Sequence, residues 1–159
     1  MKYRLTEETI QIGGHILHRI ECVTAFAHVK VGDKGGWIES EANLSQYGDA
    51  WVCGDARVYD DAKVYGNAKV CDSAEVYGNA EVCGDAKVCD NADYIVFKNW
   101  WSSGRYYTWT RSNNKWRVGC FYGTGEELIA KAYKDSEVSG REYQRVVDYV
   151  NSILQEGKI

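Results

Sequence analysis

The sequence predicts a mainly β fold of stacked three-sided coils, closed by a hairpin at one end and by a small α+β unit at the other. Residues 52–93 repeat a six-residue unit seven times without a slip, with Val opening each unit and Ala at its fifth position. A unit this short cannot fold alone, so neighbouring units must stack. Cys53, Cys71 and Cys89 recur at every third unit, which makes three units one coil.

Each position of the six-residue unit has a physical role in such a coil. Val and Ala point inward, because β-branched and small side chains suit a narrow prism with flat sides. Gly, Asp and Asn at the third and fourth positions tolerate the corner conformations. The sixth position faces solvent, and an offset of one full coil pairs Arg57 with Glu75 and Lys63 with Glu81.

The cysteine column has three interpretations. The first is that Cys alternates with Tyr as a modest apolar corner residue. The others follow from the spacing of neighbouring strands, about 4.8 Å, which would let adjacent thiols form a disulfide or capture a soft metal ion. We favour the first interpretation.

The N-terminal segment predicts a β-hairpin, because Gly13 and Gly14 separate two apolar runs and supply the positive φ angles of a two-residue turn. Strand alternation puts His15 and His18 on opposite faces, so they cannot share a ligand, and we expect both to be ordinary hairpin residues. Residues 29–51 continue the Ala column and predict a degenerate first coil. The expected domains are 1–28 for the hairpin cap, 29–93 for the coils and 94–159 for a C-terminal α+β cap.

After residue 93 the six-residue period ends. Three strands are expected at 94–101, 106–112 and 115–122, followed by two helices with capping boxes at Thr124 and Ser139. The apolar stripe of the second helix is expected to pack on the apolar face of this sheet. The opposite face is expected to be exposed and to carry Tyr106, Thr108, Thr110, Lys115, Arg117 and Phe121.

The repeats, together with the preceding GDKGGWIESEANLSQYGDAWV, resemble the hexapeptide-repeat proteins, and in particular a group of short phage and prophage proteins often labelled as transferases. The resemblance covers residues 1–93. It implies a fold class: mainly β, a left-handed parallel β-helix of hexapeptide repeats with an N-terminal β-hairpin cap and a small C-terminal α+β domain. It also implies a homo-oligomer, since the resembling proteins are usually trimers.

The enzymes of that superfamily are chiefly acyltransferases, with a carbonic anhydrase branch, and both place histidine at the cleft between subunits. No repeat unit here contains histidine, because His15, His18 and His28 all precede the clean repeats. Acyl transfer then lacks its proton acceptor, and a three-histidine zinc site lacks its ligands. His28 with Asp33 is the one residual acid–base pair. The sequence therefore leans against an enzyme and predicts no cofactor and no metal site.

Residues 94–125 carry the sharper functional signal, since they hold five basic residues and no acidic residue. Cations that alternate with aromatic rings are typical of protein hot spots and of single-stranded nucleic-acid or nucleotide binding. We expect a protein partner first and a nucleotide or nucleic acid second. Once the rings expected under the helices are set aside, the candidate partner-binding residues are Trp101, Arg105, Tyr106, Lys115, Arg117 and Phe121.

These features predict a non-catalytic binding protein of phage type. Its β-helix would be a stem for oligomerisation, and its basic, aromatic cap would recognise a protein or an anionic partner. The resemblance extends this role to inhibition of a host defence system, in the manner of an anti-CRISPR protein or by sequestering a nucleotide signal. The alternatives are a hexapeptide-repeat acyltransferase-like enzyme and a single-stranded nucleic-acid binder.

No segment resembles a signal peptide or a transmembrane helix, so we expect a cytoplasmic protein of a bacterial host that makes no membrane contact. Six cysteines without a secretion signal indicate reduced thiols.

Overall fold

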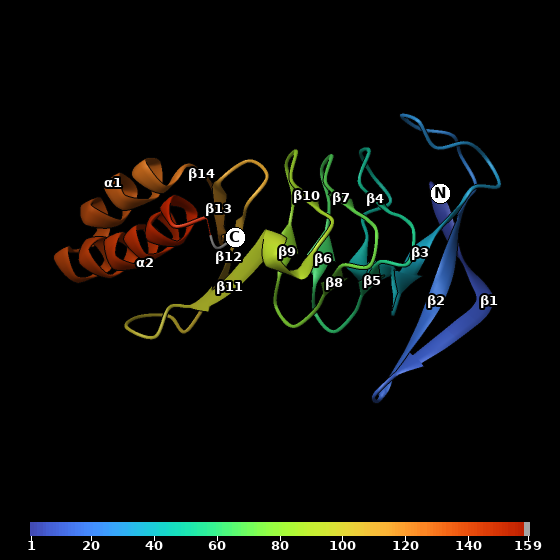
Figure 1. Ribbon diagram of the computed structural model, residues 1–159, viewed down its shortest axis with the longest axis horizontal. Coiled ribbons are helices and arrows are strands. Elements are labelled where there is room, and N and C mark those ends of the chain that lie inside the picture. The colour runs from blue at the N-terminus through green and yellow to red at the C-terminus, as the bar shows by residue number, and fades with distance from the viewer. Residues whose placement is uncertain (158–159) are drawn as a thin grey trace.

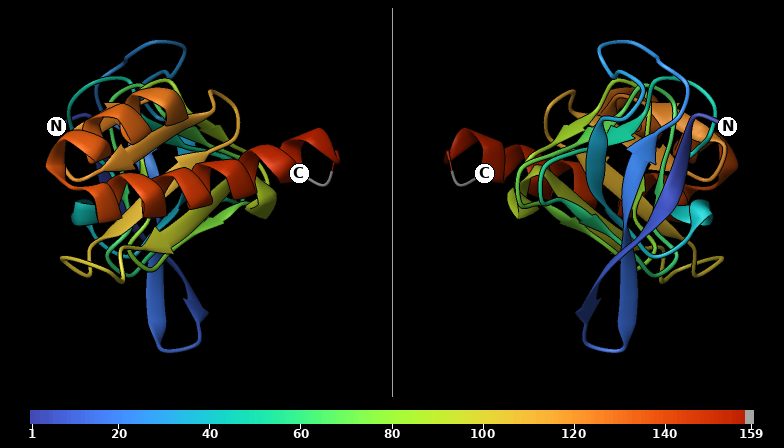
Figure 2. Two further views of the ribbon diagram at one scale, coloured as in Figure 1. Left: turned by 90° about the vertical axis from the view of Figure 1, so that its left-hand side faces the viewer. Right: turned by 90° about the vertical axis from the view of Figure 1, so that its right-hand side faces the viewer.

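The computed structural model describes residues 1–157 and is elongated (Figure 1), with the hairpin at one end, the coils in the middle and two helices at the other end. The end views in Figure 2 show the helices crossing one end of the stack and the hairpin crossing the other. Within the described residues, neither helix combines the length and the apolar composition needed to cross a lipid bilayer.

The N-terminal hairpin forms as predicted, with Gly13 in the left-handed conformation at its turn (φ +55°). Its strands are followed by a third strand that pairs antiparallel with the second. A short 3₁₀ helix then opens the first coil. These elements are β1 (Tyr3–Ile12), β2 (His15–Cys22), β3 (Lys34–Ile38) and η1 (Glu41–Asn43).

Each repeat unit contributes one strand of two residues, in which the second residue is the inward-pointing Val. These strands are β4 (Trp51–Val52), β5 (Arg57–Val58), β6 (Lys63–Val64), β7 (Lys69–Val70), β8 (Glu75–Val76), β9 (Glu81–Val82) and β10 (Lys87–Val88). Each of the first four pairs in parallel with the strand one full coil further on. The Val and Ala side chains of the repeats from Val52 to Val88 are at most 1 % exposed and form the interior of the coils, as the repeat predicts, whereas Ala92 of the last unit is exposed.

The strands do not form one continuous left-handed parallel β-helix, so the predicted fold class is wrong in that respect. They fall into four separate sheets: a mixed sheet in the order β1-β2-β3-β5-β8, parallel sheets β10-β7-β4 and β6-β9, and an antiparallel sheet β11-β12-β13-β14. Each corner turns the chain from one ladder to the next, and the antiparallel hairpin extends one of the ladders. The fold is mainly β, with several small sheets and two helices.

The C-terminal sheet has four strands where the sequence predicted three. Gly119, with a φ of +57°, makes a turn that splits the predicted strand 115–122 in two. The 3₁₀ helix η2 joins this sheet to the last coil. The elements are η2 (Asn91–Asp93), β11 (Tyr94–Lys98), β12 (Tyr106–Thr110), β13 (Lys115–Val118) and β14 (Phe121–Gly123).

Two helices, α1 (Gly125–Asp135) and α2 (Glu137–Gln155), cover one face of this sheet. The capping box at Thr124 is confirmed. The predicted cap at Ser139 is wrong, because α2 begins earlier and the Ser136 side chain accepts the N–H of Ser139. Only one residue therefore separates the two helices, which places them side by side over the sheet (Figure 2).

Of the two ion pairs predicted between coils, one forms and the other does not, and two of the column cysteines are oxidised. Arg57 and Glu75 form the expected ion pair at 3.2 Å. Lys63 stands opposite Glu81 in the ladder, but the Glu81 carboxylate pairs with a cation of the C-terminal sheet instead. Cys71 and Cys89 form a disulfide, so the expectation of six reduced thiols is wrong for this pair.

Candidate partner-binding surface

The stacked coils leave unpaired backbone groups at both ends of the stack. Along each ladder the N–H of one coil donates to a carbonyl of the next coil, as the Arg57 N–H donates to the Ala74 oxygen at 2.9 Å. The first coil therefore has carbonyls without donors, and the last coil has N–H groups without acceptors. Because an unpaired buried backbone group is costly, the first end needs donors and the last end needs acceptors.

The C-terminal segment supplies the acceptors. Three N–H groups of the last coil lie where the next coil would begin, and each donates to a side-chain oxygen of a residue after Asp90. The pairs are Glu75 to Asn91 Oδ1 at 2.9 Å, Glu81 to Thr108 Oγ1 at 2.9 Å and Lys87 to Ser112 Oγ at 2.8 Å. The face of β12 and β13 that the sequence predicted to be exposed is thus turned toward the last coil.

The N-terminal hairpin supplies the donors. Lys2 Nζ donates to the Ala50 carbonyl at 2.7 Å, and the Tyr3 hydroxyl donates to the Leu44 carbonyl at 2.5 Å. Arg19 Nη1 donates to the Gly35 carbonyl at 2.9 Å. Burial lowers the pKa of Lys2 to about 8, as expected for an ammonium that is held among carbonyls and away from water.

Two of the predicted partner-binding residues, Arg117 and Lys115, make contacts within the molecule. Arg117 Nε lies 3.5 Å from Glu81 Oε2, and its guanidinium lies over the ring of Tyr65 at 5.6 Å. Lys115 Nζ lies 5.3 Å from the centre of the Tyr122 ring, and that ring in turn contacts Gly84 of the last coil. Arg117 therefore joins the small sheet to the coils directly, and Lys115 packs on the Tyr122 ring that makes the same junction.

Phe121 lies on the other face of the sheet. The turn at Gly119 puts Phe121 directly opposite Val118, so both side chains point toward the helices. A continuous strand would place Phe121 on the opposite face, so the prediction that Phe121 shares a face with Arg117 is wrong.

The loop 99–105, between β11 and β12, carries the other three predicted residues at or beside it. The loop is closed by hydrogen bonds from the Asn99 N–H to the Arg105 carbonyl at 2.8 Å and from the Gly104 N–H to the Asn99 carbonyl at 2.9 Å. The Asn99 side chain is buried and donates to the Tyr143 hydroxyl of α2 at 3.2 Å. The loop is therefore fixed to the helices.

Two adjacent tryptophans of this loop have different environments. The Trp101 indole N–H donates to Ser139 Oγ at 3.1 Å, and its ring meets Tyr143 edge-on with centroids 4.9 Å apart. Trp100 is 71 % exposed and stands edge-on to Trp101 at 6.0 Å. Trp101, predicted to bind a partner, is thus a support, and Trp100 is the exposed ring. The sequence shows only that the two rings are adjacent.

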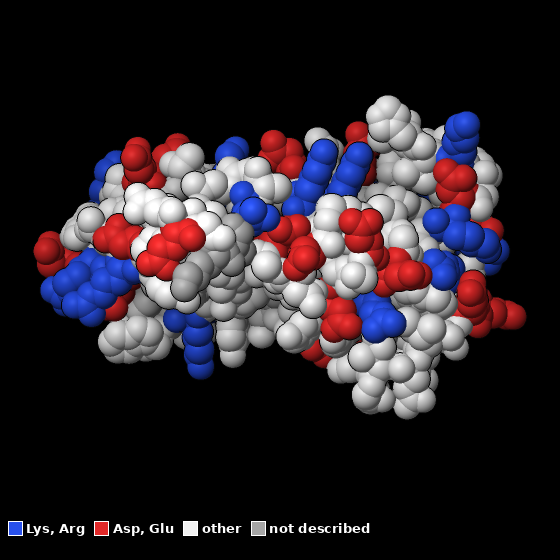
Figure 3. Space-filling view, in the orientation of Figure 1, with Lys and Arg blue, Asp and Glu red and all other residues white. Residues whose placement is uncertain are grey.

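Two cations stand at the two ends of the loop that carries the exposed ring. Within residues 1–157, neither Lys98 nor Arg105 forms an ion pair. Lys98 Nζ lies 5.8 Å from the centre of the Tyr106 ring, and Tyr106 is 46 % exposed. Arg105 packs on Gly119, where the guanidinium leaves no room for a side chain. In Figure 3 a basic side chain projects from the lower edge of the cap, where Figure 1 shows this loop.

Tyr106 separates two hollows that lie between this loop and the coils. The first, about 580 Å³, is lined by Arg105 and by charged coil residues that include Asp60, Asp61, Lys63 and Glu81. The second, about 520 Å³, is lined chiefly by aromatic and apolar side chains that include Tyr77, Tyr94 and Val96. We define the Trp100 surface as Lys98, Trp100, Arg105 and Tyr106. Of these, Tyr106 lines both hollows and Arg105 lines the first.

His15 was predicted to be an ordinary hairpin residue, but it lies between two carboxylates. Its Nδ1 is 2.8 Å from Glu39 Oε2, and its Nε2 is 3.1 Å from Asp60 Oδ1. The hydrogen bond with Glu39 raises the pKa of His15, and the same bond lowers the pKa of Glu39. The three side chains also offer metal-ligand atoms within 4.8 Å of one another. With both ring nitrogens engaged, His15 is not placed to act as a general base; it ties the hairpin to the coils.

The one acid–base pair that the sequence offered, His28 with Asp33, is not formed as a hydrogen bond in the described part of the chain. The Asp33 carboxylate accepts the N–H of Lys30 at 2.9 Å.

No protein-family model matches this chain, and no curated protein matches its sequence. The prediction of a phage protein that inhibits host defence depended on a continuous parallel β-helix and on relatives of that type. The four separate sheets contradict that fold class, so the phage and host-defence interpretation is left without support.

Proposed function

We propose that this protein is a non-catalytic binding protein that recognises an acidic protein partner through the Trp100 surface. The exposure of Trp100 carries the proposal. A large aromatic ring is held in the open at 71 % exposure by a loop whose own anchors, Asn99 and Trp101, are bonded to α2.

Trp100 has the properties of an anchor for a protein interface. An indole buries a large area when a partner covers it, and Trp, Tyr and Arg are the residue types most often found at hot spots. Because the loop is already fixed, binding would order little additional backbone, which lowers the entropic cost of association.

The charges around Trp100 indicate an acidic partner. Lys98 and Arg105 have no ion pair within the described residues, and residues 94–125 contain no acidic residue. Complementary charge on a partner would speed the encounter and fix its orientation. Protein acids opposite these two cations would complete pairs that the chain itself leaves open.

A nucleic-acid partner is less well supported. Single-stranded binding needs a track of cations beside several stacking rings. Trp109 and Trp116 are buried in the core under the helices, while Lys115 and Arg117 are engaged against Tyr122 and Glu81. Only the small Trp100 surface remains for contacts to bases and phosphates.

The test is affinity capture from nuclease-treated cell extract, followed by titration calorimetry with each purified captured protein. Trp100→Ala should weaken binding of a true partner by about thirtyfold, since truncating a hot-spot Trp costs about 2 kcal/mol or more. Arg105→Glu should weaken it as well, and added salt should reduce the effect of this charge reversal.

Matched controls are available on α2, at exposed side chains that do not anchor the loop. Tyr149 is 57 % exposed and Arg141 is an exposed cation, so Tyr149→Ala and Arg141→Glu should bind like the wild type. Equal loss in all four variants, or no loss in the two loop variants, would contradict the proposal. Retention of single-stranded DNA or RNA at low salt, abolished by Trp100→Ala, would assign this surface to nucleic acid instead. Homo-oligomerisation stays a prediction, to be checked by light scattering.

A further inference from the structure

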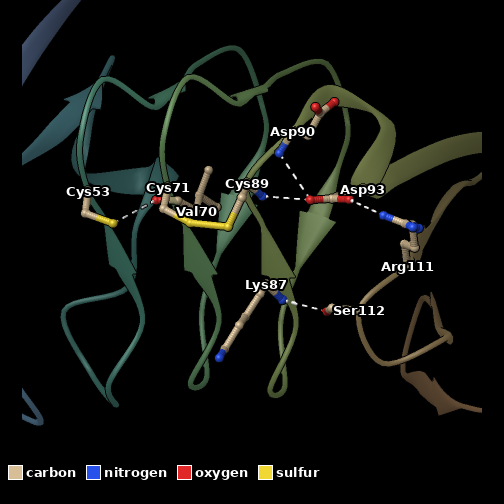
Figure 4. Close-up of a disulfide and its surroundings, with 9 residues drawn as sticks. All are labelled: Cys53, Val70, Cys71, Lys87, Cys89, Asp90, Asp93, Arg111 and Ser112. Atoms are coloured by element: carbon tan, nitrogen blue, oxygen red, sulfur yellow. Dashed lines mark hydrogen bonds and ion pairs between the residues drawn. A yellow bond between two sulfur atoms is a disulfide. The ribbon is translucent and has the colours of Figure 1, made fainter. Parts of the chain in front are cut away.

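The three cysteines of the column lie in register on one corner of successive coils (Figure 4). Pairing of Val70 with Val88 sets Cys71 beside Cys89, whose Cα atoms are 4.7 Å apart across their disulfide. Cys53 precedes Cys71 by one coil and is a half-buried free thiol. Figure 4 shows its sulfur on the same side as the disulfide and directed along the column.

We propose that Cys53, Cys71 and Cys89 form one thiol–disulfide exchange site, in which the disulfide occupies either the Cys71–Cys89 position or the Cys53–Cys71 position.

The geometry fits this exchange in three respects. A thiolate attacks a disulfide sulfur through a mixed-disulfide step, and the column places Cys53 beside Cys71 on the side away from Cys89 (Figure 4). The pairing of Val52 with Val70 puts Cys53 one strand spacing from Cys71, about 4.8 Å, which falls within the range of about 4.4–6.8 Å that disulfides accept. Cys53 and Cys89 are separated by about twice that spacing and cannot bond. Every disulfide in the column must therefore include Cys71.

The step is balanced without an added oxidant or reductant. The Cys53 thiolate attacks Cys71 Sγ, the Cys53–Cys71 bond forms as the Cys71–Cys89 bond breaks, and Cys89 leaves as a thiolate. The proton released from Cys53 is matched by the proton that Cys89 takes up. One disulfide and one thiol are present before and after.

The surroundings of Cys53 indicate a slow exchange. Burial raises the pKa of the Cys53 thiol, the Asp72 carboxylate raises it further, and Lys69 lowers it. Only a small fraction is then thiolate at neutral pH, and the thiolate is the attacking species. An acid quench would therefore trap the distribution before it changes.

The position of the bond decides which coils are tied together. In the Cys71–Cys89 position it fastens the last coil, where the Cys89 N–H donates to Asp93 Oδ2 at 2.9 Å and Arg111 pairs with the same carboxylate group at 3.3 Å. In the Cys53–Cys71 position it fastens the earlier coil and releases the junction with the C-terminal sheet. The exchange thus moves a covalent tie toward or away from the sheet that carries the Trp100 surface.

The test is disulfide mapping of the full chain carrying Cys120→Ser, which removes the exposed thiol. After mild oxidation, long incubation at neutral pH, acid quench and alkylation, trypsin with a Glu-specific protease places Cys53, Cys71 and Cys83 in different peptides. In molecules with one column disulfide, alkylation should appear on Cys53 in some and on Cys89 in others, and never on Cys71. Alkylation on Cys53 alone, or no disulfide in the column, would overturn the proposal.

Two variants test the site without depending on how the wild-type protein divides between the two disulfide positions. Cys89→Ser should form the Cys53–Cys71 disulfide on oxidation, while Cys71→Ser should form no bridge between Cys53 and Cys89. A thermal melt of each variant confirms that it is folded before mapping. If Cys89→Ser is folded and leaves Cys53 and Cys71 as thiols, the exchange site does not exist. If Cys89→Ser does not fold, the wild-type alkylation pattern decides the question alone.

Discussion

Replacing Thr108 with Val would test whether the C-terminal sheet closes the coil stack through backbone hydrogen bonds. Thr108 is 1 % exposed, and its Oγ1 accepts the Glu81 N–H at 2.9 Å. Val keeps the size and branching of Thr but removes the acceptor. The Glu81 N–H would then be buried without a partner, at a cost of about 1–3 kcal/mol. For a chain of this length, about 2 kcal/mol lowers the melting temperature by about 4–8 °C.

Thr108→Ser is the matched control. It loses a buried methyl group, at about 0.5–1.5 kcal/mol, but keeps the hydroxyl that accepts the Glu81 N–H. Urea unfolding gives the two free energies, and amide hydrogen exchange locates the change. In Thr108→Val the Glu81 amide should lose its protection, while in Thr108→Ser it should stay protected. If Val is no more destabilising than Ser and the Glu81 amide exchanges at the wild-type rate, the hydrogen bond does not close the stack.

Two further predictions concern the contacts at the two ends of the coils. Gly84 and Gly78 both have positive φ angles (+61° and +65°), but a Cβ at Gly84 would collide with Tyr122, whereas a Cβ at Gly78 meets open space. Gly84→Ala should therefore lose at least about 1 kcal/mol more of unfolding free energy than Gly78→Ala. Equal losses in urea unfolding would contradict this packing. Because Glu39 holds the pKa of His15 above its ordinary value of 6.5, protonated His15 stabilises the fold fully below pH 6.5 and this contribution is lost as the pH rises through the folded-state pKa. The melting temperature of the wild type relative to His15→Gln should fall over that range, and a difference that is flat with pH would show that the triad does not hold the hairpin.

The interior of the coils could be predicted because the same six-residue pattern recurs along residues 52–93. Val and Ala return at fixed positions, and each needs only its local geometry and the offset of one coil to find its neighbours. The hairpin turn at Gly13 and the cap at Thr124 were predictable for the same reason, since both depend on residues close in the chain. The predicted continuous β-helix was wrong because the repeat does not show that the antiparallel hairpin joins one ladder into a mixed sheet while the other strands form small separate sheets.

The candidate site could not be predicted in the same way. Alternation along β12 and β13 separates two faces, but it does not say which face meets solvent. The helices pack on the apolar face, and the last coil packs on the polar face, where its unpaired N–H groups find acceptors. Arg117 therefore pairs with Glu81 of the coils and not with a partner. The hydroxyls of Thr108 and Ser112 were the available signal, since hydroxyl side chains can accept such groups. The face on which Phe121 lies depends on the turn at Gly119, which alternation alone does not predict. The sequence also does not determine whether Cys71 is oxidised.

The two ends of the coil stack carry opposite hydrogen-bonding groups, and this affects how copies of the molecule associate with one another. A parallel stack that shows only carbonyls at one end and only N–H groups at the other is complementary to itself, so bare stacks would add head to tail and grow into filaments. Lys2, Tyr3 and Arg19 occupy the carbonyls at the first end, and the hydroxyl and amide oxygens beyond residue 90 occupy the N–H groups at the last. The two caps therefore stop further coils or copies from adding to either end, although the six-residue repeat itself would allow a stack of any length.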